Sequence, residues 1–198
     1  REHDESELAH YAKKTSDIEF EYPWGWGELE GIANRGNYDL NAHQESSGKD
    51  LRYFDPNSDN KFTPSVIEPA GGLTRTLFAV LLSLYEEEEL EKEVRTLFKF
   101  KFDLAPIQIG ILPLSKKEEL IEVCNSIKSE LGPYFRTEID VTQSIGKRYR
   151  RQDEIGTPYC ITVDFDTLED KAVTVRDRDS MSQERIKIED IKSYFDNM

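Results

Sequence analysis

Hydrophobic residues in the first half of the chain switch between helical and strand-like spacing. The apolar residues of "SELAHYAKKT" recur three and four positions apart, which predicts a helix of about ten residues. Alternation in "DIEFEY" predicts a strand that Pro23 interrupts, and "GELEGIA" predicts a second strand after it. The stretch "NYDLNAHQESSG" predicts a short helix that ends at Gly48, and "LRYFDPNSDNKFTPSVIEP" predicts a hairpin with the loop "DPNSDNK".

A longer amphipathic pattern runs from Leu73 to about Leu90. Its apolar residues fall on one helical face, and the run is apolar enough to be mostly buried. We expect the acidic block "EEEELEKE" to continue this helix and "RTLFKFKFDLAP" to form a linker after it. The sequence therefore predicts a boundary near residue 103, with one domain over residues 1–103 and another over residues 104–198.

The second half of the chain alternates strands with helices. Helices are predicted from about Lys116 to Leu131, over "IGKRYRRQDEIG" and over the terminal "IEDIKSYF". Strands are predicted over "IQIGILPL", "FRTEIDV", "YCITVDF" and "AVTVRDR". This alternation is typical of an α/β domain with a mixed sheet.

Composition and charge narrow the possible functions. The 198 residues are 37% hydrophobic and 33% charged, with a formal net charge of -14, which argues against a broadly basic surface that coats nucleic acid.

Cys124 and Cys160 lie in apolar surroundings without metal-ligand spacing, so we expect reduced core thiols of a cytoplasmic protein. The sequence predicts neither a membrane span nor a signal peptide. The three histidines have neither metal-ligand spacing nor a nearby nucleophile, and we interpret them as structural or surface residues.

Two stretches of the first half bring candidate binding residues together. In "PWGWGELEG", Glu28 and Glu30 point to the same side of a strand unless a bulge intervenes, and such a pair either is solvated or binds an ammonium group. In "EPAGGLTR", Glu68 adds a carboxylate, and Arg75 at the start of a helix is suited to a polyphosphate or an aromatic base. The two glycines between them either allow a ligand to approach the backbone or form a tight turn.

One concentrated positive segment stands out in this acidic chain. Lys147, Arg148, Arg150 and Arg151 fall within five residues around Tyr149. These cations either form a solvent-facing helix paired with neighbouring carboxylates or contact an RNA backbone or base. The two interpretations carry similar weight from this segment alone.

Five segments in this order resemble the C-terminal part of dimeric glycyl-tRNA synthetases: "ELAHYA", "PWGWGELEGIANRGNYDL", "VIEPAGGLTR", "SIGKRYRRQDEIGTPYC" and "DFDTLEDKAVTVRDRD". The resemblance covers nearly the whole chain. It implies an α+β part and an α/β part: a partial class II synthetase catalytic domain with an antiparallel sheet, followed by a mixed-sheet anticodon-binding domain.

The resemblance also implies ligands and roles. "EPAGGLTR" looks like the third signature motif of class II synthetases, so Arg75 would hold the γ-phosphate of ATP and border the adenine, with Gly72 and Glu68 beside them. Glu28 and Glu68 would hold the ammonium group of glycine, with Ala70 in the same site, where the family usually carries serine. Trp24 would form an aromatic wall of the glycine pocket. Lys147, Arg148, Arg150 and Arg151 would contact tRNA(Gly). Mg²⁺ would accompany ATP, and the parent protein would be a homodimer.

Two functions from different classes follow as expectations. In the first, the chain is part of a glycine-tRNA ligase and, lacking the first two signature motifs of the class, does not activate glycine unaided. In the second, it is a non-catalytic module that binds tRNA or another partner. Retention of Glu28, Glu68 and Arg75 favours the first; the missing motifs and Ala70 favour the second.

Overall fold

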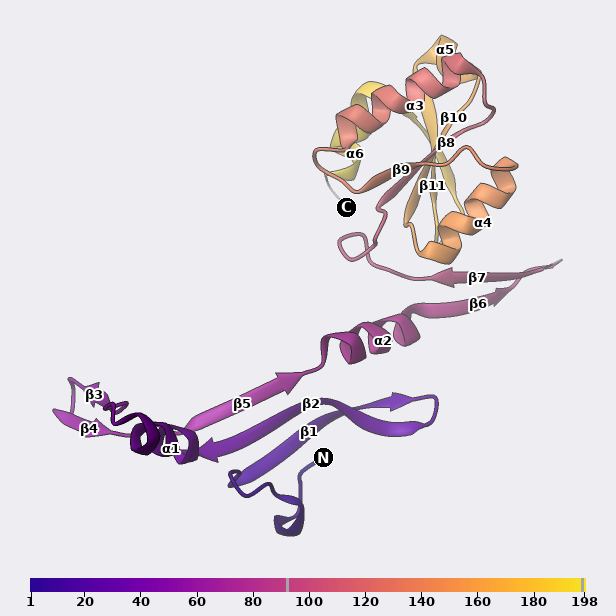
Figure 1. Cartoon of the computed structure of the whole chain (residues 1–198). Coiled ribbons are helices and arrows are strands. Elements are labelled where there is room, and N and C mark those ends of the chain that lie inside the picture. The colour runs from indigo at the N-terminus through magenta and orange to yellow at the C-terminus, as the bar shows by residue number, and fades with distance from the viewer. Residues whose placement is uncertain (92, 197) are drawn as a thin grey trace. The chain divides into compact units, whose positions relative to one another are not determined.

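The chain folds into two compact units. A computed structural model describes residues 1–91, 93–196 and 198 (Figure 1). The first unit comprises Arg1–Ser83 and the second comprises Leu84–Met198. Each unit has its own sheets.

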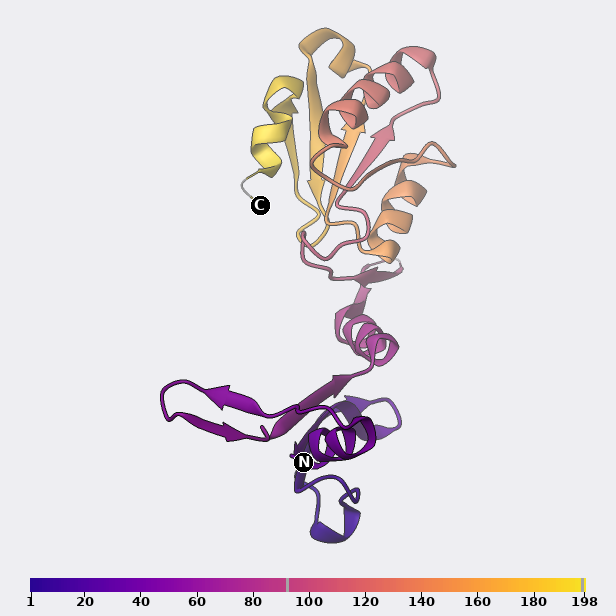
Figure 2. The same cartoon turned by 60° about the vertical axis from the view of Figure 1, so that its left-hand side comes forward.

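The first unit is built on a three-stranded antiparallel sheet in the order β1-β2-β5. Its strands are β1 (Lys14–Tyr22), β2 (Gly25–Gly36) and β5 (Val66–Gly71). The other elements are the helices α1 (Tyr38–Ser47) and α2 (Leu73–Leu84) and the hairpin of β3 (Tyr53–Asp55) with β4 (Asn60–Phe62). Figure 2 shows this hairpin reaching out beyond the three-stranded sheet. The two predicted strands, the helix ending at Gly48 and the hairpin are confirmed.

The predicted helix over "SELAHYAKKT" is wrong. Only a short 3-10 turn, η1 (Glu5–Glu7), forms there, and β1 already begins at Lys14. Lys14 pairs with Asn34 and Thr15 with Ala33, so the backbone of this segment finds its hydrogen bonds in the sheet. Pairing with β2 overrides a weak local helical pattern.

The predicted continuation of the helix from Leu84 to about residue 90, and the linker after it, are also wrong. The chain instead forms a hairpin of β6 (Tyr85–Glu89) and β7 (Val94–Phe98). Successive glutamates would repel one another on a helix, whereas the hairpin sets them against cations. Lys99 Nζ lies 2.6 Å from Glu86 Oε2, and Arg95 Nη1 lies 2.8 Å from Glu88 Oε2.

The second unit is centred on a mixed five-stranded sheet in the order β12-β11-β10-β8-β9. β8 runs parallel to β9 and β10, while β11 is antiparallel to β10 and β12. The strands are β8 (Ile109–Pro113), β9 (Thr137–Ile139), β10 (Tyr159–Val163), β11 (Ala172–Asp177) and β12 (Gln183–Lys187). The predicted mixed sheet is confirmed, and β12 is an edge strand that the hydrophobic pattern did not indicate.

Helices cover both faces of this sheet (Figure 1). They are α3 (Glu118–Leu131), α4 (Ile145–Ile155), α5 (Asp166–Asp170) and α6 (Ile191–Phe195), the last preceded by the 3-10 turn η2 (Ile188–Asp190). α3 and α6 pack their apolar residues on one face and close the main core. Cys124 and Cys160 are free and buried, as expected, and burial raises the pKa of each thiol to about 12.

α4 packs on the opposite face of the sheet through polar residues. A Cβ atom built on Gly110 of β8 would lie 3.0 Å from Gln152 Oε1, so a glycine at this position lets the helix approach. Gln152 in turn accepts a hydrogen bond of 2.7 Å from the Thr157 hydroxyl. The fit between α4 and β8 on this face is therefore tight.

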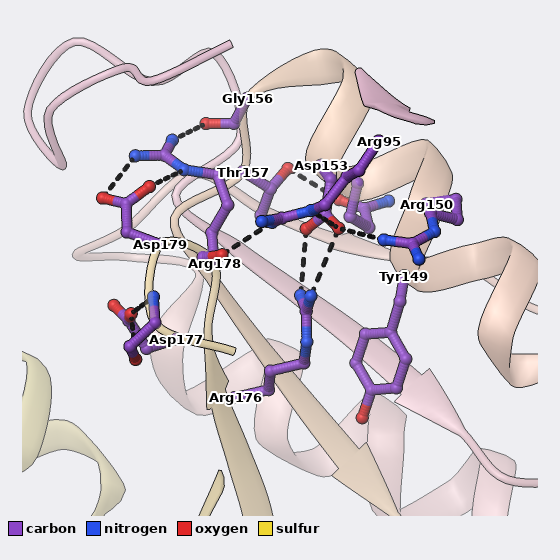
Figure 3. Close-up of polar contacts among 12 residues, drawn as sticks. Arg95, Tyr149, Arg150, Asp153, Gly156, Thr157, Arg176, Asp177, Arg178 and Asp179 are labelled. Carbon is purple, nitrogen blue, oxygen red and sulfur yellow. Dashed lines mark hydrogen bonds and ion pairs between the residues drawn. The ribbon is translucent and has the colours of Figure 1, made fainter. Parts of the chain in front are cut away.

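A buried ion network ties the β6–β7 hairpin to α4 and β11 (Figure 3). Asp153, fully buried on α4, accepts from Arg95 Nε at 2.9 Å and from Arg176 at 2.9 and 3.2 Å. Arg95 Nη2 also donates to the carbonyl of Arg178 at 2.6 Å. Burial opposes the charge on Arg95, but hydrogen bonds from its guanidinium to Asp153 and Glu88 raise its pKa, so Arg95 stays charged.

This network explains where the second unit begins. The predicted boundary lies near residue 103, whereas the compact units divide after Ser83. The hairpin belongs to the second unit because Arg95 reaches Asp153 and because Arg178 Nη1 donates to the carbonyl of Phe98 at 3.0 Å. Both contacts cross the predicted boundary.

Replacing Asp153 with alanine should destabilise the second unit by about 3–5 kcal/mol, because two buried arginines lose their shared carboxylate. Urea unfolding followed by far-ultraviolet circular dichroism measures this change. Glu154→Ala is the matched control on the exposed side of the same helix turn, and we expect it to change the unfolding free energy by less than about 0.5 kcal/mol. Equal effects of the two substitutions would contradict this account of the network.

Candidate functional site

A cavity of about 290 Å³ in the first unit gathers four carboxylates, and we call it the carboxylate cavity. Its acidic residues are Glu7, Asp17, Glu28 and Glu68. Small residues of the sheet form its floor: Gly31, Ala33 and Ala70. Its acidic walls and small floor suit a small cationic ligand rather than a bulky or anionic one.

The strand register explains why these residues share one face. Two cross-strand rows run over the sheet, one from Asp17 through Gly31 to Ala70 and the other from Thr15 through Ala33 to Glu68. Because side chains alternate along each strand, all six residues project from the same face. The carboxylates of Asp17 and Glu68 therefore approach the same space from the two outer strands.

A bulge in β2 adds Glu28 to this face. Ile18 pairs with Glu30 and Glu19 pairs with Glu28, so Leu29 is an extra residue between two paired positions. Glu28 consequently lies on the side of Gly31, and Glu30 is not among the residues that line the cavity. A Cβ atom on Gly31 would lie 3.4 Å from Glu28 Oε1 and 3.7 Å from Asp17 Oδ1, so the two carboxylates converge above this glycine.

A second cavity of about 250 Å³ lies beside the first, and we call it the aromatic cavity. Tyr22, Trp24 and Phe78 line it with nearly parallel rings, at centroid separations of 5.0 Å for Tyr22 and Trp24 and 5.8 Å for Trp24 and Phe78. Arg75 lines the same cavity, and its Nη1 donates to the main-chain carbonyl of Glu28 at 2.7 Å. A flat apolar surface beside a guanidinium suits an aromatic base with an attached anion.

Glu28 belongs to both cavities. Its side chain is part of the wall of the carboxylate cavity, and its carbonyl holds the arginine of the aromatic cavity. A ligand with a cationic end and an aromatic, anionic end therefore finds both kinds of surface on the two sides of one residue.

The predicted residues of this site differ in which cavity they line. Glu28, Glu68 and Ala70 line the carboxylate cavity, and Arg75 lines the aromatic cavity. Gly72 lines neither of them; its carbonyl accepts hydrogen bonds from the amide and hydroxyl of Thr76 at 2.8 and 3.0 Å, as at a helix start.

Trp24, expected from the resemblance as an aromatic wall of the glycine pocket, lines the aromatic cavity and not the carboxylate cavity. Sequence reasoning missed Asp17, whose Oδ2 lies 2.6 Å from His3 Nε2 and whose side chain is almost wholly buried. The alternation in "DIEFEY" places Asp17 in a strand, but only the pairing with Gly31 brings it to Glu28.

The basic segment of α4 does not form one continuous surface. Arg148 is buried, and its guanidinium donates to the carbonyls of Gln143 and Pro113. Arg151 pairs with Asp140 on one flank, and Arg150 pairs with Glu93 on the other. The three arginines of the segment therefore form hydrogen bonds or ion pairs within the second unit.

Lys147 is the exposed member of the segment. It lines a cavity of about 430 Å³ together with Arg150, Tyr149 and Arg176. Arg176, which sequence reasoning missed, lies over the Tyr149 ring at 4.9 Å from its centroid. This flank of α4 presents cations beside an aromatic ring, the combination expected at an RNA-contacting surface.

Comparison with known proteins first defines the class. Residues 108–198 match the family model described as an anticodon binding domain. Among solved structures, prolyl-tRNA synthetase from Cryptosporidium parvum, complexed with L-proline and AMP, resembles the chain with a TM-score of 0.69 and 20% identity. The match covers 99% of this chain and 40% of that one. The chain therefore has the fold of part of a class II aminoacyl-tRNA synthetase, including its anticodon-binding domain.

Sequence relatives then narrow the class. The chain is 57% identical over 198 residues to a glycine-tRNA ligase of Lachnospira eligens, and 54% and 52% identical to those of Clostridium acetobutylicum and Bacillus cereus. These matches cover 99–100% of this chain, which spans about 42% of the length of the curated relatives. The predicted resemblance to glycyl-tRNA synthetases is thus confirmed over the whole chain.

Within the described residues, no helix is both long and apolar enough to cross a lipid bilayer.

Proposed function

We propose that this chain supplies part of the glycine-activating site and the anticodon-binding domain of a glycine-tRNA ligase. The observation that carries the proposal is the position of Glu28 between a carboxylate-lined cavity and a cavity with Arg75 and stacked aromatic rings. Glycyl-adenylate, the activated intermediate of such a ligase, has an ammonium group at one end and an adenine with a phosphate at the other. The two cavities match these two ends.

The amino-acid end would bind in the carboxylate cavity. Carboxylates of Glu28 and Glu68 would receive the ammonium group of glycine through charge-assisted hydrogen bonds. Ala70 and Gly31 pair with each other in the sheet beside these glutamates. Because these two residues are small, they would leave space for the bound amino acid. Asp17 adds negative charge beneath the same group.

The ATP end would bind in the aromatic cavity. Arg75 would neutralise phosphate charge, and the rings of Trp24 and Phe78 would border the adenine. Tyr22 supports this assignment, since its buried hydroxyl has no hydrogen-bond partner among the described residues and a ligand would supply one. Gly72 acts only through the start of α2.

In the proposed reaction the glycine carboxylate attacks the α-phosphate of ATP in line, and pyrophosphate leaves. The terminal ribose hydroxyl of the tRNA then takes the glycyl group and AMP is released. Residues of this chain would bind and orient the two substrates and balance their charges, and no protein nucleophile is needed.

Among the described residues no group of three or more His, Cys, Asp or Glu side chains is arranged to hold a metal ion. Mg²⁺ would enter with the phosphates of ATP, and we assign no residue and no step to it.

The second unit would bind the anticodon arm of tRNA(Gly). The anticodon-domain match of residues 108–198 supports this role. We place the contact surface on the flank of α4 that carries Lys147 and Arg150, and we leave out Arg148 and Arg151, which do not line the cavity there. A cytoplasmic location, in which Cys124 and Cys160 stay reduced, and a dimeric parent protein both stay predictions.

Arg75→Ala, made in the full-length protein that carries this chain, should lower glycine-dependent ATP-pyrophosphate exchange about 100-fold, because a charged partner of the phosphates is lost. Arg52→Ala is the matched control, an exposed arginine of the same unit that lines neither cavity. Unchanged exchange in the Arg75 variant would exclude the enzymatic role of this site. It would favour the alternative, a tRNA-binding module without catalytic function.

Lys147→Ala should weaken tRNA(Gly) binding and lower the slope of log affinity against log salt by about 1, because one phosphate contact is lost. The stability of the protein should not change, since Lys147 is exposed. Lys128→Ala, an exposed lysine on α3 across the sheet, serves as control. Equal tRNA affinity in the wild type and the Lys147 variant at low salt would rule out this surface.

A further inference from the structure

Arg35, at the end of β2, lies behind one of the carboxylates that the proposed function uses. Its Nη1 donates to Glu68 Oε2 at 2.6 Å. Its Nε and Nη2 donate to the two carboxylate oxygens of Asp39 at 2.6 and 2.8 Å, a bidentate pair. Arg35 itself does not line the carboxylate cavity. It therefore contacts the proposed glycine site indirectly, through Glu68 and Tyr11, which both line that cavity.

Three neighbours fix the guanidinium in place. Asp39 holds it from the first turn of α1, and Glu68 holds it from β5. The Tyr11 ring covers its flat side, with 3.9 Å between the guanidinium carbon and the ring centroid. Since Oε2 of Glu68 is bonded to a guanidinium held in this way, the carboxylate has one orientation with Oε1 left for another partner.

The charges of the three groups decide what Glu68 can bind. A pair of Arg35 and Glu68 alone would be neutral and would attract a cationic ligand weakly. Asp39 changes this balance, because one positive and two negative groups leave a net charge of -1. Hydrogen bonding to Arg35 lowers the pKa of Asp39, and hydrogen bonds to Asp39 and Glu68 raise the pKa of Arg35, so both stay ionised near neutral pH.

We propose that Arg35 and Asp39 are a positioning pair for glycine: Arg35 aims the Glu68 carboxylate at the substrate ammonium group, and Asp39 preserves the negative charge of that carboxylate. The inference rests on the proposed function, because it assigns Glu68 to glycine. It adds two residues that touch neither glycine nor ATP and that act on the amino-acid end alone.

The test measures glycine-dependent ATP-pyrophosphate exchange in the full-length protein that carries this chain. Asp39→Asn keeps the shape and removes the charge, so we expect the KM for glycine to rise about tenfold while the KM for ATP changes less than twofold. Arg35→Gln should also raise the KM for glycine, because Glu68 loses its fixed partner. Asp39→Glu keeps the charge and should retain a KM for glycine within about threefold of the wild type.

Asp50 and Arg52 provide matched controls in the same unit. They form a bidentate pair of the same kind, with distances of 2.9 and 3.0 Å, and line neither cavity. Asp50→Asn and Arg52→Gln should leave both KM values unchanged. Melting temperatures of all variants show whether a loss of activity comes from unfolding. If Asp39→Asn does not fold, Arg35→Lys takes its place in the test of the inference. We expect Arg35→Lys to raise the KM for glycine without changing the KM for ATP.

The possible outcomes separate the inference from the proposed function. A wild type that shows no glycine-dependent exchange overturns the proposed function and this inference with it. A wild type that is active, with the KM for glycine unchanged in Asp39→Asn and Arg35→Gln, overturns the inference alone. Equal increases in the KM for glycine and for ATP, or equal losses in the Asp50 and Asp39 variants, would also overturn it, because they would indicate a general structural role.

Discussion

One extra residue in β2 determines which side chains meet in the first unit. Leu29 is the bulge between Glu28 and Glu30, and it places Glu28 on the face that already carries Gly31, Ala33, Ala70 and Glu68. Without the bulge, strict alternation would place Glu28 on the opposite face from Gly31. The convergence of carboxylates, and the contact of Arg75 with the Glu28 carbonyl beside them, both depend on this local register.

The two units use charge in different ways. In the first unit, carboxylates from three strands line a cavity in which only part of their charge is balanced, so a cation is favoured there. In the second unit, the buried carboxylates have arginine partners: Asp153 is shared between Arg95 and Arg176, and Asp140 is held by Arg151. A buried carboxylate without such partners would be strongly destabilising, so these arginines contribute to the fold itself.

Sequence reasoning succeeded where local spacing decides the structure. Most strands and helices of the second half, apart from β12 and α5, follow from periodicity and turn residues, as do the turn at Gly48 and the strand-to-helix junction at "EPAGGLTR". It failed where a distant partner decides the structure. The acidic block became a strand because Lys99 and Arg95 face it across a hairpin, and "KKT" joined a strand because Asn34 and Ala33 pair with it. Asp17 and Arg35 were missed for the same reason, since their partners lie in other elements. Arg148 shows that a basic run in a sequence can be structural.

The most direct test of the central claim is a crystal structure of the full-length protein with a non-hydrolysable glycyl-adenylate analogue. The account predicts that the amino group lies within hydrogen-bond distance of the Glu28 and Glu68 carboxylates. It also predicts that the adenine lies against Trp24 or Phe78 beside Arg75. An analogue bound with its amino group away from both glutamates, or bound outside the two cavities, would contradict the account.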